Sequence, residues 1–264
     1  MIIKTRSSRF SPRHQIGYTL IELLISVSLG LAMMSVAMQY LVGSSASFNA
    51  TETASRIQEN GRFALSMITD DMRMAGYGDP NNGPRPGYFL TTPCGAFDPC
   101  TANGANTDPD RIAVWYDPPA DDGTETDCTG STLGAAAQVA NVYYLDTSAE
   151  GVTSLMCRGF DVSANAWNAT GQPLIDGIDN LQILYGINSA GVLSYISADA
   201  MSAANWDEII SIRLAVLVST GLENGNSVED TRSYELIDAP EISLTDSFNR
   251  RVFSTTVVIN NATI

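Results

Sequence analysis

Residues 18–42 read YTLIELLISVSLGLAMMSVAMQYLV, an uninterrupted apolar run whose one formal charge is Glu22. About 20 such residues are enough to cross the hydrocarbon core of a bilayer as a helix. Basic residues and no acidic residue precede the run: Lys4, Arg6, Arg9 and Arg13. We therefore predict a membrane-spanning helix half over residues 18–43, with the N-terminus in the cytoplasm and the rest of the chain across the membrane.

The charge of the chain is divided unequally. Its 264 residues include 14 basic and 29 acidic ones, for a formal charge of −15, but from residue 18 onward ten basic residues face 29 acidic ones, or −19. Lys4 and His14 are the only lysine and histidine. Without residues 1–17 the chain lacks the lysine and histidine that most nucleophilic catalysis and many metal sites require. We therefore expect no enzyme and no cofactor, and the acidic excess argues against general nucleic-acid binding.

Three interpretations of the N-terminus compete. A secretory signal peptide, cut near Ser44-Ser45-Ala46, has an apolar core of about 7–15 residues, shorter than this run. A plain membrane anchor leaves Glu22 unexplained, because a carboxylate in hydrocarbon is costly. If the chain is cut between Gly17 and Tyr18 instead, the new α-amino group of Tyr18 is a cation about one helical turn from Glu22, on the same or a neighbouring chain.

The octapeptide Gly17-Tyr18-Thr19-Leu20-Ile21-Glu22-Leu23-Leu24 resembles the type IV prepilin signature. The resemblance implies that residues 1–17 are a leader and that a prepilin peptidase cleaves after Gly17. It further implies N-methylation of Tyr18 and a role for Glu22 in setting the register of assembly. The peptidase is then one expected partner.

The sequence after the apolar run continues with helical periodicity. We predict one helix from Thr19 to Ala75, whose second half, 44–75, is amphipathic and packs on a head domain, 44–264. Gly76-Tyr77-Gly78-Asp79-Pro80 is a strong stop signal. The predicted apolar stripe comprises Ala50, Ala54, Ile57, Gly61, Ala64, Leu65, Ile68, Met72 and Ala75.

Residues 76–110 contain six prolines and six glycines and predict a long irregular loop. The four cysteines are Cys94, Cys100, Cys128 and Cys157. An even number of cysteines in an exported domain favours disulfides, and of the three possible pairings we prefer Cys94–Cys100 with Cys128–Cys157. A zinc site made of all four is the alternative.

The region 111–264 shows a period of two residues, which predicts strands. The strands are expected at 111–116, 140–145, 154–158, 181–187, 192–196, 210–218 and 253–259, with a hairpin turn at 188–191. Together with the helix they predict an α+β, pilin-like fold: a long N-terminal α-helix packed on an antiparallel β-sheet head.

Further motifs resemble PilW-type minor pilins, in the expected order along the chain. They are residues 59–65 and 70–77, Asp127-Cys128-Thr129-Gly130, residues 177–182 with Tyr185-Gly186, Trp206 with Ile212-Arg213, and residues 250–257. The resemblance implies a minor pilin that contacts other minor pilins and the major pilin through its N-terminal helix. It also implies a tip complex with a large adhesin, which primes or caps the pilus. The protein is then expected in the inner membrane with its head in the periplasm, and later in the pilus.

Other interpretations stay open. A J-type pseudopilin of a type II secretion system shares the leader, the helix and a sheet-rich head, and a tip-exposed adhesion module overlaps with the pilin. Arg250-Arg251 could contact DNA, but a surface pair joined to acidic neighbours is the simpler expectation. An acidic segment could bind calcium, although a solvated loop is favoured because the spacing of an EF-hand is missing. Its residues are Asp117, Asp121, Asp122, Glu125 and Asp127.

Overall fold

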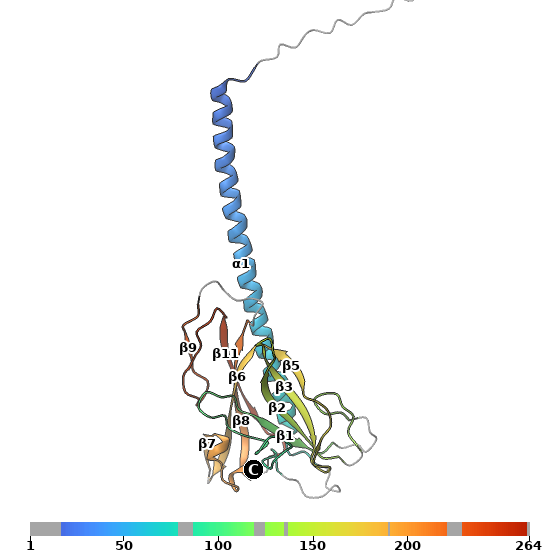
Figure 1. Ribbon diagram of the computed structural model, residues 1–264. Helices are drawn as coiled ribbons and strands as arrows, with labels where there is room; N and C mark the ends of the chain where they lie inside the picture. The colour runs from blue at the N-terminus through green and yellow to red at the C-terminus, as the bar shows by residue number, and fades with distance from the viewer. Residues whose placement is uncertain are drawn as a thin grey trace, which may run out of the picture. The chain divides into compact units, whose positions relative to one another are not determined.

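The computed structural model describes residues 17–78, 87–118, 125–134, 137–189, 191–220 and 229–262. The chain divides into two compact units, residues 1–52 and 53–264. Helix α1 (Leu20–Met74) contributes residues to both (Figure 1). The predicted helix is thus confirmed to within one residue at each end.

The ends of α1 are defined by local chemistry. Thr19 precedes the first helical residue, and its Oγ1 accepts a hydrogen bond from the Glu22 N–H at 3.3 Å, as an N-cap residue does. Gly76 follows the last turn with φ at +71°, a left-handed conformation that glycine adopts at little cost. Tyr88 packs where a Cβ on Gly76 would stand. Both termini therefore follow from the sequence signals that flank the helix.

The strands of the second unit form two larger antiparallel sheets and one small hairpin (Figure 1). The first sheet contains β1 (Ile112–Tyr116), β2 (Val139–Thr147), β3 (Thr153–Asp161), β4 (Ala166–Trp167) and β5 (Gln172–Asp176). The second runs in the order β11 (Arg250–Val258), β8 (Ile209–Ser219), β6 (Ile178–Ser189) and β7 (Val192–Ile196). The hairpin is β9 (Ser233–Tyr234) with β10 (Ile242–Ser243). Two 3₁₀ turns, η1 (Ala198–Ala200) and η2 (Asn205–Asp207), follow β7.

The predicted α+β fold, a long N-terminal helix with an antiparallel β-sheet head, is therefore confirmed. The strands of the head divide into separate sheets, and Gly177 shows why. Its N–H donates to Thr153 O in the first sheet, while its carbonyl accepts from Ser219 N–H in the second, both at 2.8 Å. Its φ of +78° turns the chain sharply between β5 and β6. The chain thus changes sheets at a single residue, which strand periodicity does not reveal.

The main core lies between the second half of α1 and both larger sheets. The predicted stripe is buried from Ile57 onward, including Ala64, Ile68 and Met72, while Ala50 and Ala54 are exposed. Buried side chains of β6 and β8, such as Ile183 and Leu214, belong to the same cluster. Burial of this stripe attaches α1 to the sheets of the second unit.

Residues 87–110 contain no named strand, as expected of an irregular loop, yet they form a packed layer. The Leu90 N–H donates to Ala113 O at 2.9 Å and the Trp115 N–H donates to Tyr88 O at 3.0 Å. This segment therefore covers the outer edge of β1. Phe89, Leu90 and both of its cysteines are buried. Residues 79–86 of the predicted loop lie outside the described residues.

Candidate functional site

The candidate site begins just before α1. Gly17 and Tyr18 are exposed and not helical, and the side chain of Tyr18 is 85% accessible. The predicted leader up to residue 16 lies outside the described residues. Glu22 is the acidic residue of the first helical turn. The predicted cleavage site, methylation site and carboxylate are thus within one helical turn of the start of α1.

The local geometry adds Thr19 to this set. Thr19 and Glu22 have the spacing of a capping box, in which a Thr and a Glu three residues apart satisfy the first backbone N–H groups of a helix. One half of that arrangement is present, the bond from the Glu22 N–H to Thr19 Oγ1. A carboxylate in the first turn also interacts favourably with the helix dipole. Thr19 therefore caps the helix through the backbone N–H of Glu22, and the Glu22 carboxylate adds the dipole interaction. The T-x-x-E spacing in the sequence could have indicated this cap.

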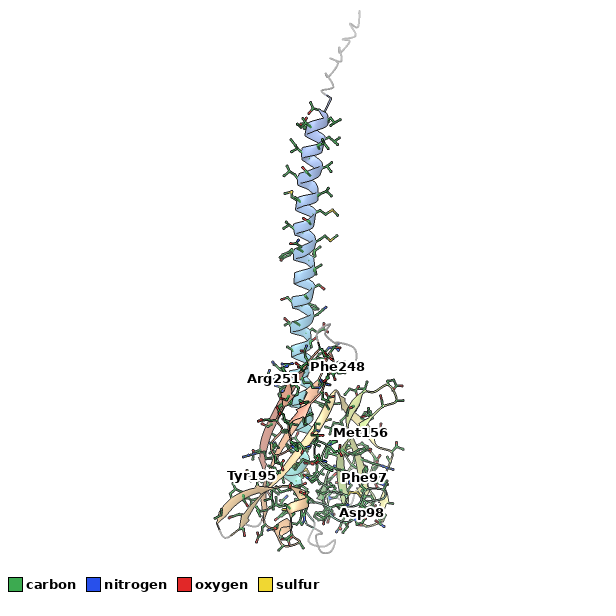
Figure 2. The ribbon with its side chains drawn as sticks, turned by 60° about the vertical axis from the view of Figure 1, so that its left-hand side comes forward. Phe97, Asp98, Met156, Tyr195, Phe248 and Arg251 are labelled. Atoms are coloured by element: carbon green, nitrogen blue, oxygen red, sulfur yellow. A yellow bond between two sulfur atoms is a disulfide. The ribbon has the colours of Figure 1, made fainter. Side chains whose placement is uncertain are left out.

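The first part of α1 has an apolar surface with no partner in its own unit. Every described residue from Gly17 to Glu52 is exposed. The large apolar side chains among them include Leu20, Leu24, Leu31, Val42 and Phe48. Among the described residues, α1 is the helix long and apolar enough to cross a membrane. Figure 2 draws these side chains along the helix.

Hydroxyl groups inside the apolar run are satisfied within the helix. Ser26 Oγ donates to Glu22 O at 2.7 Å, Ser28 Oγ to Ile25 O at 2.9 Å, and Ser35 Oγ to Ala32 O at 2.8 Å. Because each hydroxyl bonds a carbonyl three or four residues earlier, it needs no water or partner. These serines are therefore compatible with an apolar environment.

Polar contacts fix the second half of α1 to the sheets. Asp71 Oδ2 accepts hydrogen bonds from Asn141 Nδ2 and from the Tyr143 hydroxyl, both at 2.7 Å. Burial raises the pKa of Asp71 above its usual value, although both hydrogen bonds act in the opposite direction. Asn60 Nδ2 donates to Asp176 O at 3.2 Å. The helix is therefore tied to β2 and to the end of β5.

The structure contains both preferred disulfides, Cys94–Cys100 and Cys128–Cys157. The alternative zinc site is wrong, because no cysteine is left free. The first disulfide closes a loop around Phe97, labelled in Figure 2. The Phe97 ring lies 5.1 Å from that of Tyr144, and the Arg111 guanidinium lies 4.1 Å from the Phe97 ring. The disulfide thus shapes a packed element of the head.

The described residues of the acidic segment proposed for calcium are not solvated as we expected. Asp121 and Asp122 lie outside the described residues, and Glu125 is half-buried. Asp127 is 5% exposed, and Asp117 is also buried. Asp127 Oδ1 accepts from the Thr129 and Ser131 N–H groups, and its Oδ2 accepts from Asn168 Nδ2. Asp127 therefore organises a turn, and the described residues contain no group of three or more His, Cys, Asp or Glu side chains that could hold a metal ion.

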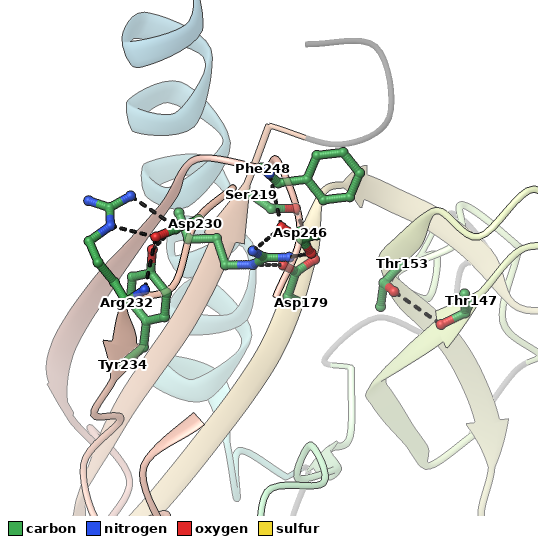
Figure 3. Close-up of polar contacts among 10 residues, drawn as sticks. Thr147, Thr153, Asp179, Ser219, Asp230, Arg232, Tyr234, Asp246 and Phe248 are labelled. Atoms are coloured by element: carbon green, nitrogen blue, oxygen red, sulfur yellow. Dashed lines mark hydrogen bonds and ion pairs between the residues drawn. The ribbon is translucent and has the colours of Figure 1, made fainter. Parts of the chain in front are cut away.

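Arg250 and Arg251 have different environments, which corrects the expectation of a surface pair. Arg250 is buried and donates to Asp179 at 2.6 Å and to Asp246 at 2.7 Å and 2.5 Å. Figure 3 shows Asp179 and Asp246 at this network. The hydrogen bonds from Arg250 hold the pKa of Asp246 below its usual value. A DNA contact through Arg250 is thus wrong, whereas Arg251 is exposed.

A second hydrogen-bonded ionic cluster, centred on Asp230, lies close by (Figure 3). Asp230 accepts two hydrogen bonds from the Arg232 guanidinium, at 2.8 Å and 2.9 Å, and one from the Tyr234 hydroxyl at 2.5 Å. The hydrogen bonds from Arg232 hold the pKa of Asp230 below its usual range. Together with the Arg250 network, this cluster fixes the β9–β10 hairpin region beside β11.

Two family models match the chain. The model described as type IV pilus-assembly protein W matches residues 142–261, and the prokaryotic N-terminal methylation motif matches residues 12–38. No curated protein matches the chain in sequence. A type IV-like pilin from Thermus thermophilus matches in structure, with 12% identity and a TM-score of 0.45 over 79% of this chain and 99% of that one. That structural likeness is too low to support a conclusion about this chain.

The two family matches lie at opposite ends of the chain and agree with the motifs of the sequence. An apolar N-terminal helix with this methylation motif fits a pilin that is anchored in the inner membrane and assembled into a pilus. Membership of such an assembly implies contacts with other pilus components. The two matches therefore confirm the resemblance seen in the sequence, and they support a PilW-type type IV pilin with a prepilin leader.

Proposed function

We propose that this protein is a minor pilin that primes or caps the type IV pilus as part of a tip complex. Its partners there are other minor pilins, the major pilin and a large tip adhesin. The observation that carries the proposal is the exposed apolar half of α1 with Glu22 in its first turn. Such a helix gains stability only by packing in a membrane or among neighbouring helices.

In this proposal, cleavage of the leader creates the positively charged α-amino group that pairs with Glu22. In this proposal a prepilin peptidase cuts between Gly17 and Tyr18 and methylates the new α-amino group, and the methylation motif over residues 12–38 supports this step. An amine on a neighbouring subunit then pairs with Glu22 within an apolar bundle. Because an unpaired charge there is costly, the pair favours one axial register over others.

In this proposal the protein occupies two locations, one before and one after assembly. Before assembly the apolar half of α1 spans the inner membrane and the head lies in the periplasm. After assembly the same residues lie in the core of the filament, with the head at or near its tip. The acidic chain, at the formal charge of −19 that residues 18–264 carry, gives no general affinity for nucleic acid.

A clean deletion of the gene tests this function against the pseudopilin alternative. The strain is scored for surface pili and for secreted exoenzymes, and a plasmid copy restores the wild type. We expect pili to be lost or strongly reduced while secretion stays normal. Lost secretion with normal pili would instead support a J-type pseudopilin, and normal assembly with lost adhesion would support a tip-exposed adhesion module.

A further inference from the structure

The two edges of the second sheet differ in how they are protected. Strand β7 has five residues and ends one edge, whereas β11 has nine and ends the other. The pairing of β11 with β8 is continuous, without a bulge. The segment Val252–Val258 contains neither a proline nor a charge. Free edges in natural sheets are usually short or interrupted by such features, so β11 is unusually open to pairing.

The hydrogen bonds at the ends of β11 show which of its backbone groups are free. Thr220 N–H donates to Asn249 O, and Ile259 N–H donates to Ile210 O, both at 3.0 Å. In an antiparallel pair, alternate residues direct their N–H and C=O groups toward the partner strand. The odd-numbered residues of β11 therefore face β8. The N–H and C=O groups of Val252, Ser254 and Thr256 point away from it, and no other described strand pairs with them.

A groove of about 630 Å³ runs along this edge, between β11 and α1. We call it the edge groove. Its helical wall includes Arg62, Leu65 and Thr69, and its strand wall includes Arg251 and Phe253. The space thus lies against the strand that has free backbone groups, as a strand-binding groove requires.

The edge groove is basic in an acidic protein. Three of the ten arginines that follow residue 17 line it, Arg62, Arg73 and Arg251, together with one acidic residue, Asp70. Arg73 pairs with Asp70 at 3.3 Å, but both side chains are more than half exposed, so the pair is weak. Within the described part of the chain, Arg62 forms no ion pair. The groove therefore offers uncompensated positive charge to a partner.

We propose that the edge groove binds an extended, carboxylate-bearing segment of a different pilus subunit, which adds to β11 as a further strand. Its main chain bonds to the free groups of Val252, Ser254 and Thr256. Carboxylates at alternate positions of the segment face α1 and meet Arg62 and Arg251. A second copy of this chain is disfavoured, because both molecules carry a formal charge of −19 after cleavage. The inference rests on the proposed function, since it needs assembled neighbours.

Photo-crosslinking in the living cell tests the proposal on the full chain. The photoreactive residue p-benzoylphenylalanine replaces Thr256 at the free edge, Val192 on the opposite edge, or Leu31 on the apolar helix; all three positions are exposed. We expect the photoreactive residue in place of Thr256 to form a crosslink, here called capture, to a segment of a different pilus subunit that is rich in Asp or Glu. The photoreactive residue in place of Val192 is expected to capture no subunit. Leu31 reports contact with neighbouring helices independently of the edge groove.

Matched variants test whether crosslinking depends on the backbone N–H of Ser254 or on its side chain. They also test whether it depends on the positive charge of the edge groove. Ser254→Pro removes an outward N–H without breaking a bond to β8, and we expect it to lower capture from Thr256 at least tenfold. Ser254→Ala, which keeps that N–H, leaves capture unchanged. Arg62→Glu combined with Arg251→Glu lowers capture to a similar extent. Arg213→Glu, on an exposed arginine outside the groove, does not, and each variant is checked for an unchanged thermal unfolding midpoint.

The outcomes distinguish this inference from the proposed function. If a neighbouring subunit is captured at Leu31 but none is captured at Thr256, no strand is added to β11. The inference is then overturned, while the proposed role as a pilin stands. Capture of a second copy or of a segment without carboxylates, or capture that survives Ser254→Pro, also overturns it. Absence of capture at both positions contradicts the proposed function and this inference together.

Discussion

Glu22 combines two roles in a position where a carboxylate is otherwise costly. Its backbone N–H bonds Thr19 Oγ1 at the start of α1, and its side chain is the only formal charge among residues 18–42. Glutamine keeps the backbone N–H that bonds Thr19 and also occupies the third position of capping boxes, so this substitution removes the charge alone. The pairing with an amine requires the negative charge. The two roles can therefore be separated by substitution.

We predict that Glu22→Ala leaves a protein that is exported and held in the membrane but enters pili poorly, at least tenfold below the wild type. Glu22→Gln gives the same defect, because it keeps the capping geometry and removes the charge. Immunoblots of sheared pili and of membranes measure both pools. Wild-type incorporation of Glu22→Gln would limit Glu22 to its capping role.

Asp110 couples the stability of the head to pH. It is 3% exposed, and its two oxygens accept from the N–H groups of Gly104 and Ile183, both at 2.7 Å. Burial, the largest influence, raises the pKa of Asp110 to about 7, while the two hydrogen bonds oppose it. Because the folded-state pKa lies above the ordinary value of 3.8, folding favours the protonated form. This stabilisation is complete below about pH 4 and is lost as the pH rises to about 7.

We predict that the free energy of unfolding of the wild type, relative to Asp110→Asn, falls by a few kcal/mol between pH 4 and pH 7. Asparagine does not titrate, so the difference between the two proteins isolates Asp110 from the other carboxylates. Denaturant unfolding of the full chain in detergent at several pH values measures it. A difference that stays constant over this range would contradict the assignment.

Arg250 is the cation whose loss should cost the most stability. It is buried and holds Asp179 and Asp246 at the start of β11. We predict that Arg250→Met destabilises the head by about 3 kcal/mol, because both carboxylates lose their partner. Arg251→Met, on the exposed neighbour, changes stability by less than about 0.5 kcal/mol. Equal effects of the two substitutions, measured by denaturant unfolding, would contradict the network described here.

At the scale of the element, the contact between α1 and β11 depends on one glycine. A Cβ on Gly61 would collide with the ring of Phe253, although Gly61 lies within the helix, where alanine is intrinsically favoured by about 1 kcal/mol. The ring packs directly on the helix backbone. The close approach of helix and strand therefore outweighs helix propensity at this position.

We predict that Gly61→Ala destabilises the head by about 1–3 kcal/mol, because the ring must move. In the Phe253→Ala background the same change is neutral or stabilising. A double-mutant cycle on thermal or denaturant unfolding gives this coupling. Additive effects would show that the helix and β11 do not touch at Gly61.

At the scale of the whole molecule, the sequence predicted what local periodicity encodes. Helix α1 and the longer strands follow from spacings of 3.6 and 2 residues, whereas the maturation site stays a prediction from the motif between Gly17 and Glu22. The division into two sheets was not predictable, because Gly177 bonds Thr153 and Ser219, which lie far from it in sequence. The strands β4, β5, β9 and β10 were not predicted, because they are too short to show the alternation of apolar and polar residues.

The environments of the charged residues could not be predicted from the sequence either. The burial of Arg250 depends on Asp179, 71 residues away, and that of Asp127 depends on Asn168, 41 residues away. No local pattern reports such pairings. The edge groove, too, exists only because the second half of α1 and the last strand lie side by side in the fold (Figure 1).

The central claim is that a processed form of this chain is a subunit of the pilus. Mass spectrometry of the protein recovered from purified surface pili tests it most directly. We predict a chain that begins at Tyr18, carries a methyl group on its α-amino nitrogen, retains both disulfides and is present in far smaller amount than the major subunit. Absence from pili, or a chain that begins at Met1 or near Ser47, would contradict the account.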